Sequence, residues 1–248
     1  MIKSFLTTTA AVALLASSAA AFDLSALDDD ERRAFRAEVR AYLLENPEVL
    51  MEAIRVLETR QAMSEAEQDA ALIAANTAAL TDDGYSWVGG NPDGDVTIVE
   101  FLDYRCGFCR RAFPVIEELV TADSNIRLIV KEFPILGPQS ELASRFAIAV
   151  KMTEGDAAYK AVHDALMTFR GQISEDSLAR LARDQGLDEG AVMAAMALPE
   201  VDEIIATNRR LGQSMNITGT PSFVVGSQVL RGFLPLEGME QVVAEERG

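Results

Sequence analysis

Hydrophobic residues between positions 28 and 80 recur every three or four residues among Ala, Glu, Gln and Arg, and no glycine interrupts them. This periodicity predicts two helices, because side chains at such a spacing share one helix face. Phe35, Val39 and Tyr42 form the apolar face of the first helix. Asn46-Pro47 then supplies a cap and a first-turn proline for the second.

From about residue 95 onward, short apolar runs alternate with helical periodicity. The runs at 95–103 and 126–133 predict two strands, and the helical stretch at 110–120 joins them. A strand–helix–strand unit of this length implies a parallel pair with a right-handed crossover. After it we expect five helices, a two-strand hairpin and a last helix, at 140–152, 156–169, 175–184, 188–197, 201–215, 222–226, 228–231 and 235–245. The predicted order is βαβ, a helical insert and ββα, which is an α/β fold.

The second N-terminal helix has an apolar seam that it cannot bury alone. A continuous helix over residues 47–80 would be about 50 Å long at the α-helical rise. Partner subunits are the natural cover for such a seam, so we predict a homo-oligomer formed through residues 28–80. The alternative is a helix packed back onto the rest of the chain. A polar stretch at residues 58–69 interrupts the seam and is a candidate hinge.

The first 21 residues have the pattern of a secretory signal peptide. Lys3 precedes an apolar run from Phe5 to Ala16, and Ala19-Ala20-Ala21 is a small-residue cleavage site. We therefore expect cleavage after Ala21 and export to the periplasm, where disulfides persist. No later stretch has the roughly 18 consecutive apolar residues of a membrane helix, so we expect a chain that does not span the membrane.

Charge narrows the range of partners. The chain has 39 acidic and 22 basic residues, which gives a formal net charge of −17. Phosphate backbones would be repelled, so we exclude nucleic acid as a partner. The hydrophobic content of 49% is enough for a full core in one large or two small domains.

The only two cysteines of the chain, Cys106 and Cys109, form a CxxC pair where a predicted strand leads into a helix. Unpaired N–H groups and the helix dipole at that point stabilise a thiolate, the nucleophile of disulfide exchange. A purely structural disulfide across two residues would close almost no loop. Zinc needs about four ligands, and the single histidine, His163, lies far away in sequence. We interpret the pair as redox-active and His163 as an ordinary residue of the 156–169 helix.

The CxxC after a first strand, the helices inserted between βαβ and ββα, and Thr220-Pro221 before the third strand resemble the DsbA-like thioredoxin-fold thiol oxidoreductases. The stretch from Phe35 to Leu50 looks like the N-terminal domain of the suppressor-of-copper-sensitivity C (ScsC) branch, whose members suggest oligomers and disulfide shuffling. The resemblance implies an N-terminal helical oligomerisation segment and a DsbA-like thioredoxin domain. With the signal peptide, the expected divisions are residues 1–21, 22–87 and 88–248, with the helical insert at about 138–215.

The same resemblance implies roles for single residues. Cys106 matches the attacking cysteine of the family and Cys109 the resolving one. Thr220-Pro221 matches the cis-proline loop, in which the residue before the proline presents its backbone to the substrate cysteine. No cofactor is expected beyond the two thiols.

Two charged residues interrupt the apolar strands, and charged groups in such strands should be paired or shifted in pKa. In the family an acid at the position of Glu100 helps move the proton of the buried cysteine, and Lys131 is a candidate to balance its charge. A structural ion pair is the alternative. Asp103, Tyr104 and Arg105 are expected to tune the site, with Arg105 favouring the thiolate.

The dipeptide Gly107-Phe108 resembles that of isomerase-type members, because Phe108 offers neither charge nor donor where the strongest oxidases have a histidine. We therefore predict a mild oxidant whose clients are cysteine-containing exported proteins. A membrane thiol reductant is the expected partner, and a membrane oxidase is the corresponding partner if the chain is a dithiol oxidase.

Two other classes of function compete with this interpretation. A reduced CxxC suits Cu(I), so Cys106 and Cys109 are also candidate ligands of a copper-tolerance protein. A helical holdase that uses its apolar stripe is the third possibility. The accessory copper ligands would be methionines, although their helical spacing is typical of core packing, namely Met63, Met193, Met196 and Met215.

Overall fold

The computed structural model describes residues 27–248, and the predicted signal peptide at 1–21 lies outside them. The chain divides into two compact units, one ending at Thr59 and one spanning Arg60–Gly248. Helix α1 (Asp29–Glu45) begins at Asp28, whose side chain accepts two backbone N–H groups in a capping box with Glu31. Helix α2 (Glu48–Thr81) passes through residues 58–69 without a break, so the two N-terminal helices are confirmed and the polar stretch is helical.

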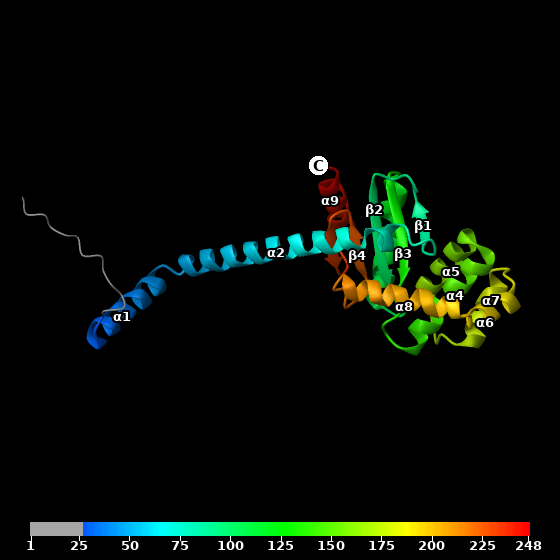
Figure 1. Ribbon diagram of the computed structural model, residues 1–248, viewed down its shortest axis with the longest axis horizontal. Coiled ribbons are helices and arrows are strands. Elements are labelled where there is room, and N and C mark those ends of the chain that lie inside the picture. Colours follow the sequence, from blue (N-terminus) through cyan, green and yellow to red (C-terminus); the bar gives the residue numbers. More distant parts are fainter. Residues whose placement is uncertain (1–26) are drawn as a thin grey trace, which may run out of the picture. The chain divides into compact units, whose positions relative to one another are not determined.

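The second unit contains a five-stranded mixed sheet in the order β1-β3-β2-β4-β5 (Figure 1). β2 and β3 pair in parallel and the other neighbours are antiparallel, so the predicted βαβ unit and hairpin are present. The strands are β1 (Trp87–Gly90), β2 (Val96–Leu102), β3 (Ile126–Glu132), β4 (Ser222–Val225) and β5 (Gln228–Arg231).

The sequence did not predict β1, because Gly89-Gly90 is typical of a boundary between domains. In the structure this dipeptide pairs with β3 at the sheet edge. Gly90 has φ +66°, and a Cβ there would lie 2.3 Å from the carbonyl oxygen of Ile126. Glycine therefore permits the close approach of the two strands.

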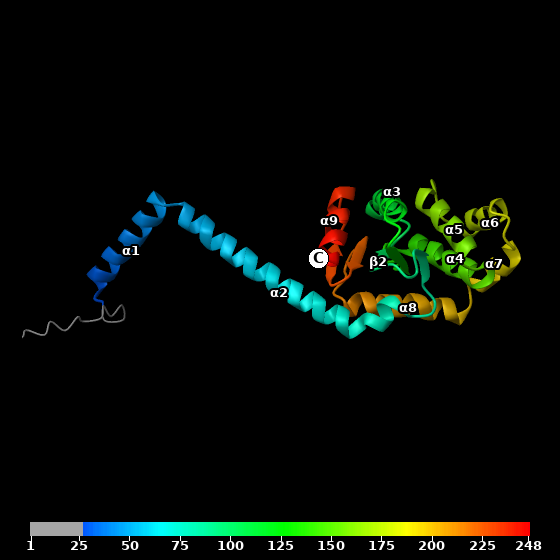
Figure 2. The same cartoon turned by 90° about the horizontal axis from the view of Figure 1, so that it is seen from above.

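Helices cover both faces of the sheet (Figure 2). α3 (Gly107–Ala122) and α9 (Leu236–Arg247) contribute to the core on one face, and α8 (Pro199–Ser214) contributes to the core on the other. The insert contains all five predicted helices, with ends shifted by a few residues. Besides α8 they are α4 (Pro138–Glu154), α5 (Asp156–Thr168), α6 (Glu175–Asp184) and α7 (Glu189–Ala195).

The last part of α2 belongs to the second unit. Leu80 is buried and Leu72 is partly buried against the core that Val99 and Phe101 of β2 form. Asp69, also buried, accepts a bidentate pair of hydrogen bonds from Arg231. The sequence placed residues 60–87 with the N-terminal segment, but Leu72 and Leu80 in this stretch pack against the core of the second unit, and Met63 stays exposed.

Candidate active site

The start of α3 brings the two cysteines to different depths. Cys106 occupies the N-cap position and is 7% exposed, whereas Cys109 is fully buried in the first turn. Both are free thiols. Burial, and next the charge of Glu100, raise the pKa of the Cys109 thiol far above its usual value. Cys106 is therefore the sulfur that an incoming disulfide can reach.

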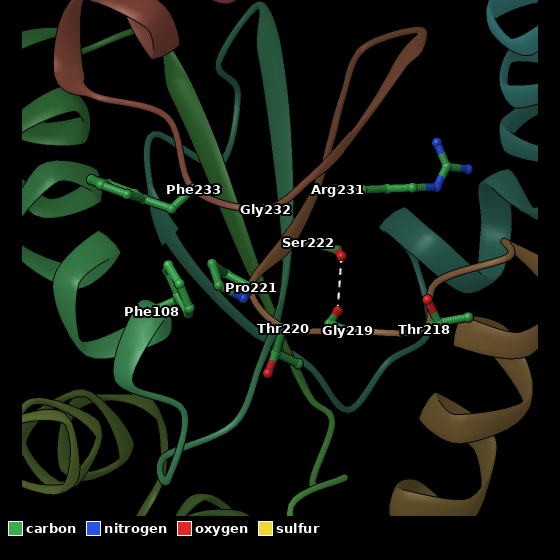
Figure 3. Close-up of a pocket in the computed structure, with 9 residues that line it drawn as sticks. All are labelled: Phe108, Thr218, Gly219, Thr220, Pro221, Ser222, Arg231, Gly232 and Phe233. Atoms are coloured by element: carbon green, nitrogen blue, oxygen red, sulfur yellow. Dashed lines mark hydrogen bonds between the residues drawn. The ribbon is translucent and has the colours of Figure 1, made fainter.

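The Thr220–Pro221 peptide bond is cis, as the family resemblance implied. Its loop faces Cys106, whose Sγ donates to the carbonyl oxygen of Thr220 at 3.1 Å. A pocket of about 350 Å³ lies beside this loop (Figure 3). It is lined by Phe108, Thr218, Gly219, Thr220, Pro221, Ser222, Arg231, Gly232 and Phe233. Phe108 is 55% exposed, so the pocket offers an apolar wall to a polypeptide that carries a cysteine.

The loop before Cys106 is held by Asp103, which is fully buried. Its carboxylate accepts hydrogen bonds from the backbone N–H groups of Arg105, Ile135 and Leu136 at 2.7–3.0 Å. The side chain of Arg105 donates to the carbonyl of Gly171 at 3.3 Å. Asp103 therefore joins the active-site loop to the loop after β3, where the apolar side chains of Ile135 and Leu136 are exposed.

Glu100 lies on β2 beneath the cysteines. It is 3% exposed, and one of its carboxylate oxygens, Oε1, has no hydrogen-bond partner. Burial, with smaller effects of Glu117 and Glu132, raises the pKa of Glu100 to about 8. A group with this proton affinity exchanges protons near neutral pH, which suits the proton of Cys109.

Lys131 does not balance Glu100, and that part of the prediction is wrong. The register pairs Phe101 with Lys131 and Glu100 with Val130, so the two charged side chains point to opposite faces of the sheet. The ammonium of Lys131 is fully buried, forms a salt bridge with Asp83 and donates to the carbonyl of Ala79 at 2.8 Å. Asp83 lies just after the end of α2. The periodicity of a strand does not reveal a contact with a residue so far away in the sequence.

The sequence analysis missed a buried polar cluster beside the active-site loop. Glu132 Oε1 accepts hydrogen bonds from the hydroxyls of Tyr104 (2.7 Å) and Tyr159 (2.6 Å). His163, interpreted as an ordinary helix residue, is buried with Nδ1 3.1 Å from the Tyr104 hydroxyl, and burial lowers its pKa to about 3. The one available signal was Glu132 itself, a second charge next to Lys131 in an apolar strand.

The four candidate copper-binding methionines lie in different environments. Met196 and Met215 are buried in separate hydrophobic clusters, Met193 is partly buried, and Met63 is exposed on α2. Within residues 27–248 no group of three or more His, Cys, Asp or Glu side chains is arranged to hold a metal ion.

Comparisons with known proteins agree with this geometry. Residues 97–244 match the model of the DSBA-like thioredoxin domain, and residues 31–63 match the copper resistance protein ScsC N-terminal domain. No helix of residues 27–248 is both long and apolar enough to cross a membrane.

Solved structures resemble the chain over most of its length. A thioredoxin-like oxidoreductase from Silicibacter pomeroyi is 41% identical, over 68% of this chain and 96% of that one, with a TM-score of 0.65. BcfH from Salmonella enterica Typhimurium is 29% identical, over 88% and 97%, with a TM-score of 0.71. ScsC from Proteus mirabilis in a transitional conformation is 28% identical, over 90% and 97%, with a TM-score of 0.65.

Curated relatives include the Na(+)/H(+) antiporter NhaA 1 of Salinispora arenicola, which is 28% identical over 159 residues. That match covers 63% of this chain and only 24% of the antiporter sequence. The matched family model covers more than half of the chain and includes the CxxC pair and the cis-proline loop. The chain therefore belongs to the family of DSBA-like thioredoxin domain proteins, which are thiol–disulfide oxidoreductases.

Proposed function

We propose that the chain is an exported thiol–disulfide oxidoreductase that rearranges disulfides in cysteine-containing client proteins. The placement of Cys106 at a helix start, against the cis Thr220–Pro221 loop and above buried Cys109, supports this function. The Cys106 thiolate attacks a client disulfide and forms a mixed disulfide with one client cysteine, and the other client cysteine leaves as a thiolate.

The mixed disulfide then has two fates. Cys109 can attack Cys106, which releases the client in reduced form and leaves a Cys106–Cys109 disulfide. A client cysteine can instead attack the client sulfur of the mixed disulfide, which leaves the client with a rearranged disulfide and Cys106 reduced again. The second fate is isomerisation, and Thr220 and Pro221 hold the client backbone while it occurs.

We infer the isomerase direction from Phe108 and from the N-terminal helices. Gly107 and Phe108, the residues between the cysteines, carry no positive charge. The helix N-terminus is therefore the main group that stabilises the thiolate of the reduced pair. The exposed apolar face of α1, formed by Phe35, Val39 and Tyr42, suits contact with other copies of the chain. Several catalytic units on one helical assembly would surround a client and raise the local concentration of thiolate.

The periplasm is the expected compartment, in keeping with a solved relative described as a periplasmic thioredoxin-like protein from Salmonella enterica serovar Typhimurium. A membrane thiol reductant would keep Cys106 reduced. The assembled form would hinder a membrane oxidase from reaching the pair.

Truncation of the mature chain tests the proposal. The cut belongs after Thr59 rather than after Leu80, because residues 60–80 cover Val99 and Phe101 and carry Asp69, the partner of Arg231. Removal of residues 22–59 should give a monomer that keeps dithiol oxidation and reduction but loses most activity on a scrambled-disulfide substrate. Light scattering and a refolding assay on the two proteins measure both effects. The proposal would be contradicted if the full chain is a monomer, or if the truncated monomer rearranges the scrambled substrate as well as the full chain does.

Copper binding is a second candidate, favoured by the match of residues 31–63 to the N-terminal domain of copper resistance protein ScsC. Two free thiols in a CxxC pair form a soft, two-coordinate site. Competition with a Cu(I) chelator separates the two functions. Tight binding that is lost in Cys109→Ser supports the copper role, whereas turnover of a scrambled substrate without such binding supports the enzyme alone.

A further inference from the structure

Glu132 is a buried carboxylate that the exchange mechanism above does not use. The parallel register of β2 and β3 pairs Glu100 with Val130 and Leu102 with Glu132. Alternate residues of a strand share a face, so Glu100 and Glu132 project from the same face of neighbouring strands. Each is only 3% exposed. Both therefore point into the core beneath the cysteines.

The two carboxylates have unequal surroundings. The hydroxyls of Tyr104 and Tyr159 both donate to Oε1 of Glu132, whose Oε2 has no partner. Oε1 of Glu100 is also buried without a partner, and among the described residues no hydroxyl donates to Glu100. Hydrogen bonds from hydroxyls stabilise an ionised carboxylate, and two neighbouring buried carboxylates resist being ionised together. The negative charge is therefore more stable on Glu132 and the proton on Glu100.

The other groups around Glu132 do not neutralise it. Among the described residues no cation forms a salt bridge with either carboxylate, and neutral His163 lies behind Tyr104. Lys151 and Tyr85 line, with Glu132, a cavity of about 10 Å³. Buried Ser144 on α4 also lies at Glu132, and its hydroxyl is among the groups that lower the pKa of this carboxyl. Further polar groups on the neighbouring elements are Asp103 after β2, Arg110 on α3, which donates to the Tyr104 and Phe169 carbonyls, and Asn208 on α8, which donates to the Glu132 carbonyl.

We propose that Glu132 is a positioning residue for disulfide exchange, whose charge adds to the effect of burial in keeping Glu100 protonated near neutral pH and thereby slows the attack of Cys109 on the mixed disulfide. This inference rests on the proposed function. In the affected step the Cys109 thiol passes its proton to the Glu100 carboxylate, the Cys109 sulfur bonds to Cys106, the Cys106–client bond breaks and the client leaves as a thiolate. A protonated Glu100 cannot accept that proton, so the mixed disulfide lasts longer and a client cysteine has more time to attack it.

The pKa values of the two carboxyls agree with a charge on Glu132 and a proton on Glu100. Burial is the main cause that raises the pKa of Glu132 to about 7, and the tyrosine hydrogen bonds oppose it. Burial is also the main cause that raises the pKa of Glu100 to about 8, followed by the charges of Glu117 and Glu132. Glu132 is thus the first of the two to ionise as pH rises.

The test uses the full mature chain in reduced form and a disulfide-linked dimer of a one-cysteine fluorescent peptide. Attack by Cys106 releases the first peptide thiol, and attack by Cys109 releases the second, so acid quenching separates the two steps from pH 5 to pH 10. In Glu132→Gln the rate of the second release should become roughly threefold to tenfold faster at pH 7. The midpoint of the pH dependence of that rate should shift down by about one pH unit. The first release should stay within about twofold, which also reports that the variant is folded.

Two further variants make the test specific. Tyr159→Phe removes one hydrogen bond to the Glu132 carboxylate and should shift the second release in the same direction by less. The Glu100→Gln/Glu132→Gln double variant should show no acceleration over Glu100→Gln, because the proton acceptor is gone. An unchanged profile in Glu132→Gln, or equal acceleration without Glu100, overturns the inference. Failure of the full chain on scrambled substrate would instead remove the isomerase function and leave this result standing.

Discussion

Helix α1 exposes apolar side chains, whereas the second unit buries charged ones. No residue of α1 is buried, and Phe35, Val39 and Tyr42 form one exposed stripe. In the sheet, by contrast, Glu100, Lys131 and Glu132 are enclosed. Both arrangements cost free energy in an isolated chain. The two costs are offset in different ways. A partner subunit can cover an apolar stripe, whereas a buried charge needs a group of opposite charge or a hydrogen-bond donor in its own chain.

The first prediction tests the exposed apolar stripe of α1 and has the largest expected effect. Phe35→Glu/Val39→Glu places charges on the stripe, so an assembly that buries the stripe should dissociate to monomers in light scattering. Rearrangement of a scrambled substrate should fall at least about tenfold with the loss of multivalency. Ala37→Glu adds a charge to the opposite face of α1 and should leave the oligomer intact. An assembly that survives the double substitution would show that the stripe is not the interface.

The second prediction concerns the buried Lys131–Asp83 pair. Lys131→Met leaves the Asp83 carboxylate buried without its counter-charge, so the free energy of unfolding should fall by about 3–5 kcal/mol. Urea unfolding followed by fluorescence of Trp87 measures it, since this is the only tryptophan. As a matched control, Lys160→Met removes a partly exposed lysine paired with Glu117 and should cost no more than about 1 kcal/mol. Equal losses in the two variants would contradict the distinction.

The third prediction uses Glu100, whose pKa is raised to about 8 in the folded chain from 4.5. The folded state then binds the proton more tightly than the unfolded state, so this group's stabilisation is lost as pH rises from about 4.5 through 8. Glu100→Gln removes the titration. Its free energy of unfolding relative to the parent should therefore increase by about 4 kcal/mol between pH 4.5 and pH 9. Parallel pH curves for the two proteins would show that Glu100 titrates normally.

Sequence periodicity predicted the order of elements well, because the insert helices are amphipathic and β2 and β3 are apolar runs. It failed for β1, whose four residues gain their hydrogen bonds only from β3. It also assigned residues 60–80 to the N-terminal segment. An apolar seam on a helix does not specify whether another subunit or the same chain covers it.

The residues of the site also divide into those that the sequence indicated and those that only the fold brings together. Spacing indicated the redox pair of Cys106 and Cys109, and the resemblance to the DsbA-like family indicated the Thr220–Pro221 loop, because local motifs carry that chemistry. The cluster of Glu132, Tyr104 and Tyr159 was beyond sequence analysis, since its hydrogen bonds join residues 27 and 28 positions apart. The Lys131–Asp83 pair, 48 positions apart, was missed for the same reason.

The last prediction sharpens the comparison within α2, because this helix carries exposed Met63 and, six residues later, buried Asp69. Asp69 pairs with Arg231 at 2.7 and 2.8 Å, and Arg231 also lines the pocket beside Pro221. The side chain of Arg231 is 43% exposed, so water can replace the lost partner in Asp69→Ala. The free energy of unfolding should therefore fall by only about 1 kcal/mol.

The effect should be local. Amide hydrogen exchange should quicken in residues 65–75 of α2 and stay unchanged in β2 and β3, because the pair fastens that stretch of helix to β5. Arg33→Ala, which breaks the exposed pair with Asp30 in α1, should change neither measurement. Exchange that quickens throughout the sheet would mean that α2 is integral to the core at Asp69. Unchanged exchange in α2 would mean that the apolar contacts of Leu72 and Leu80 hold the helix without the ion pair.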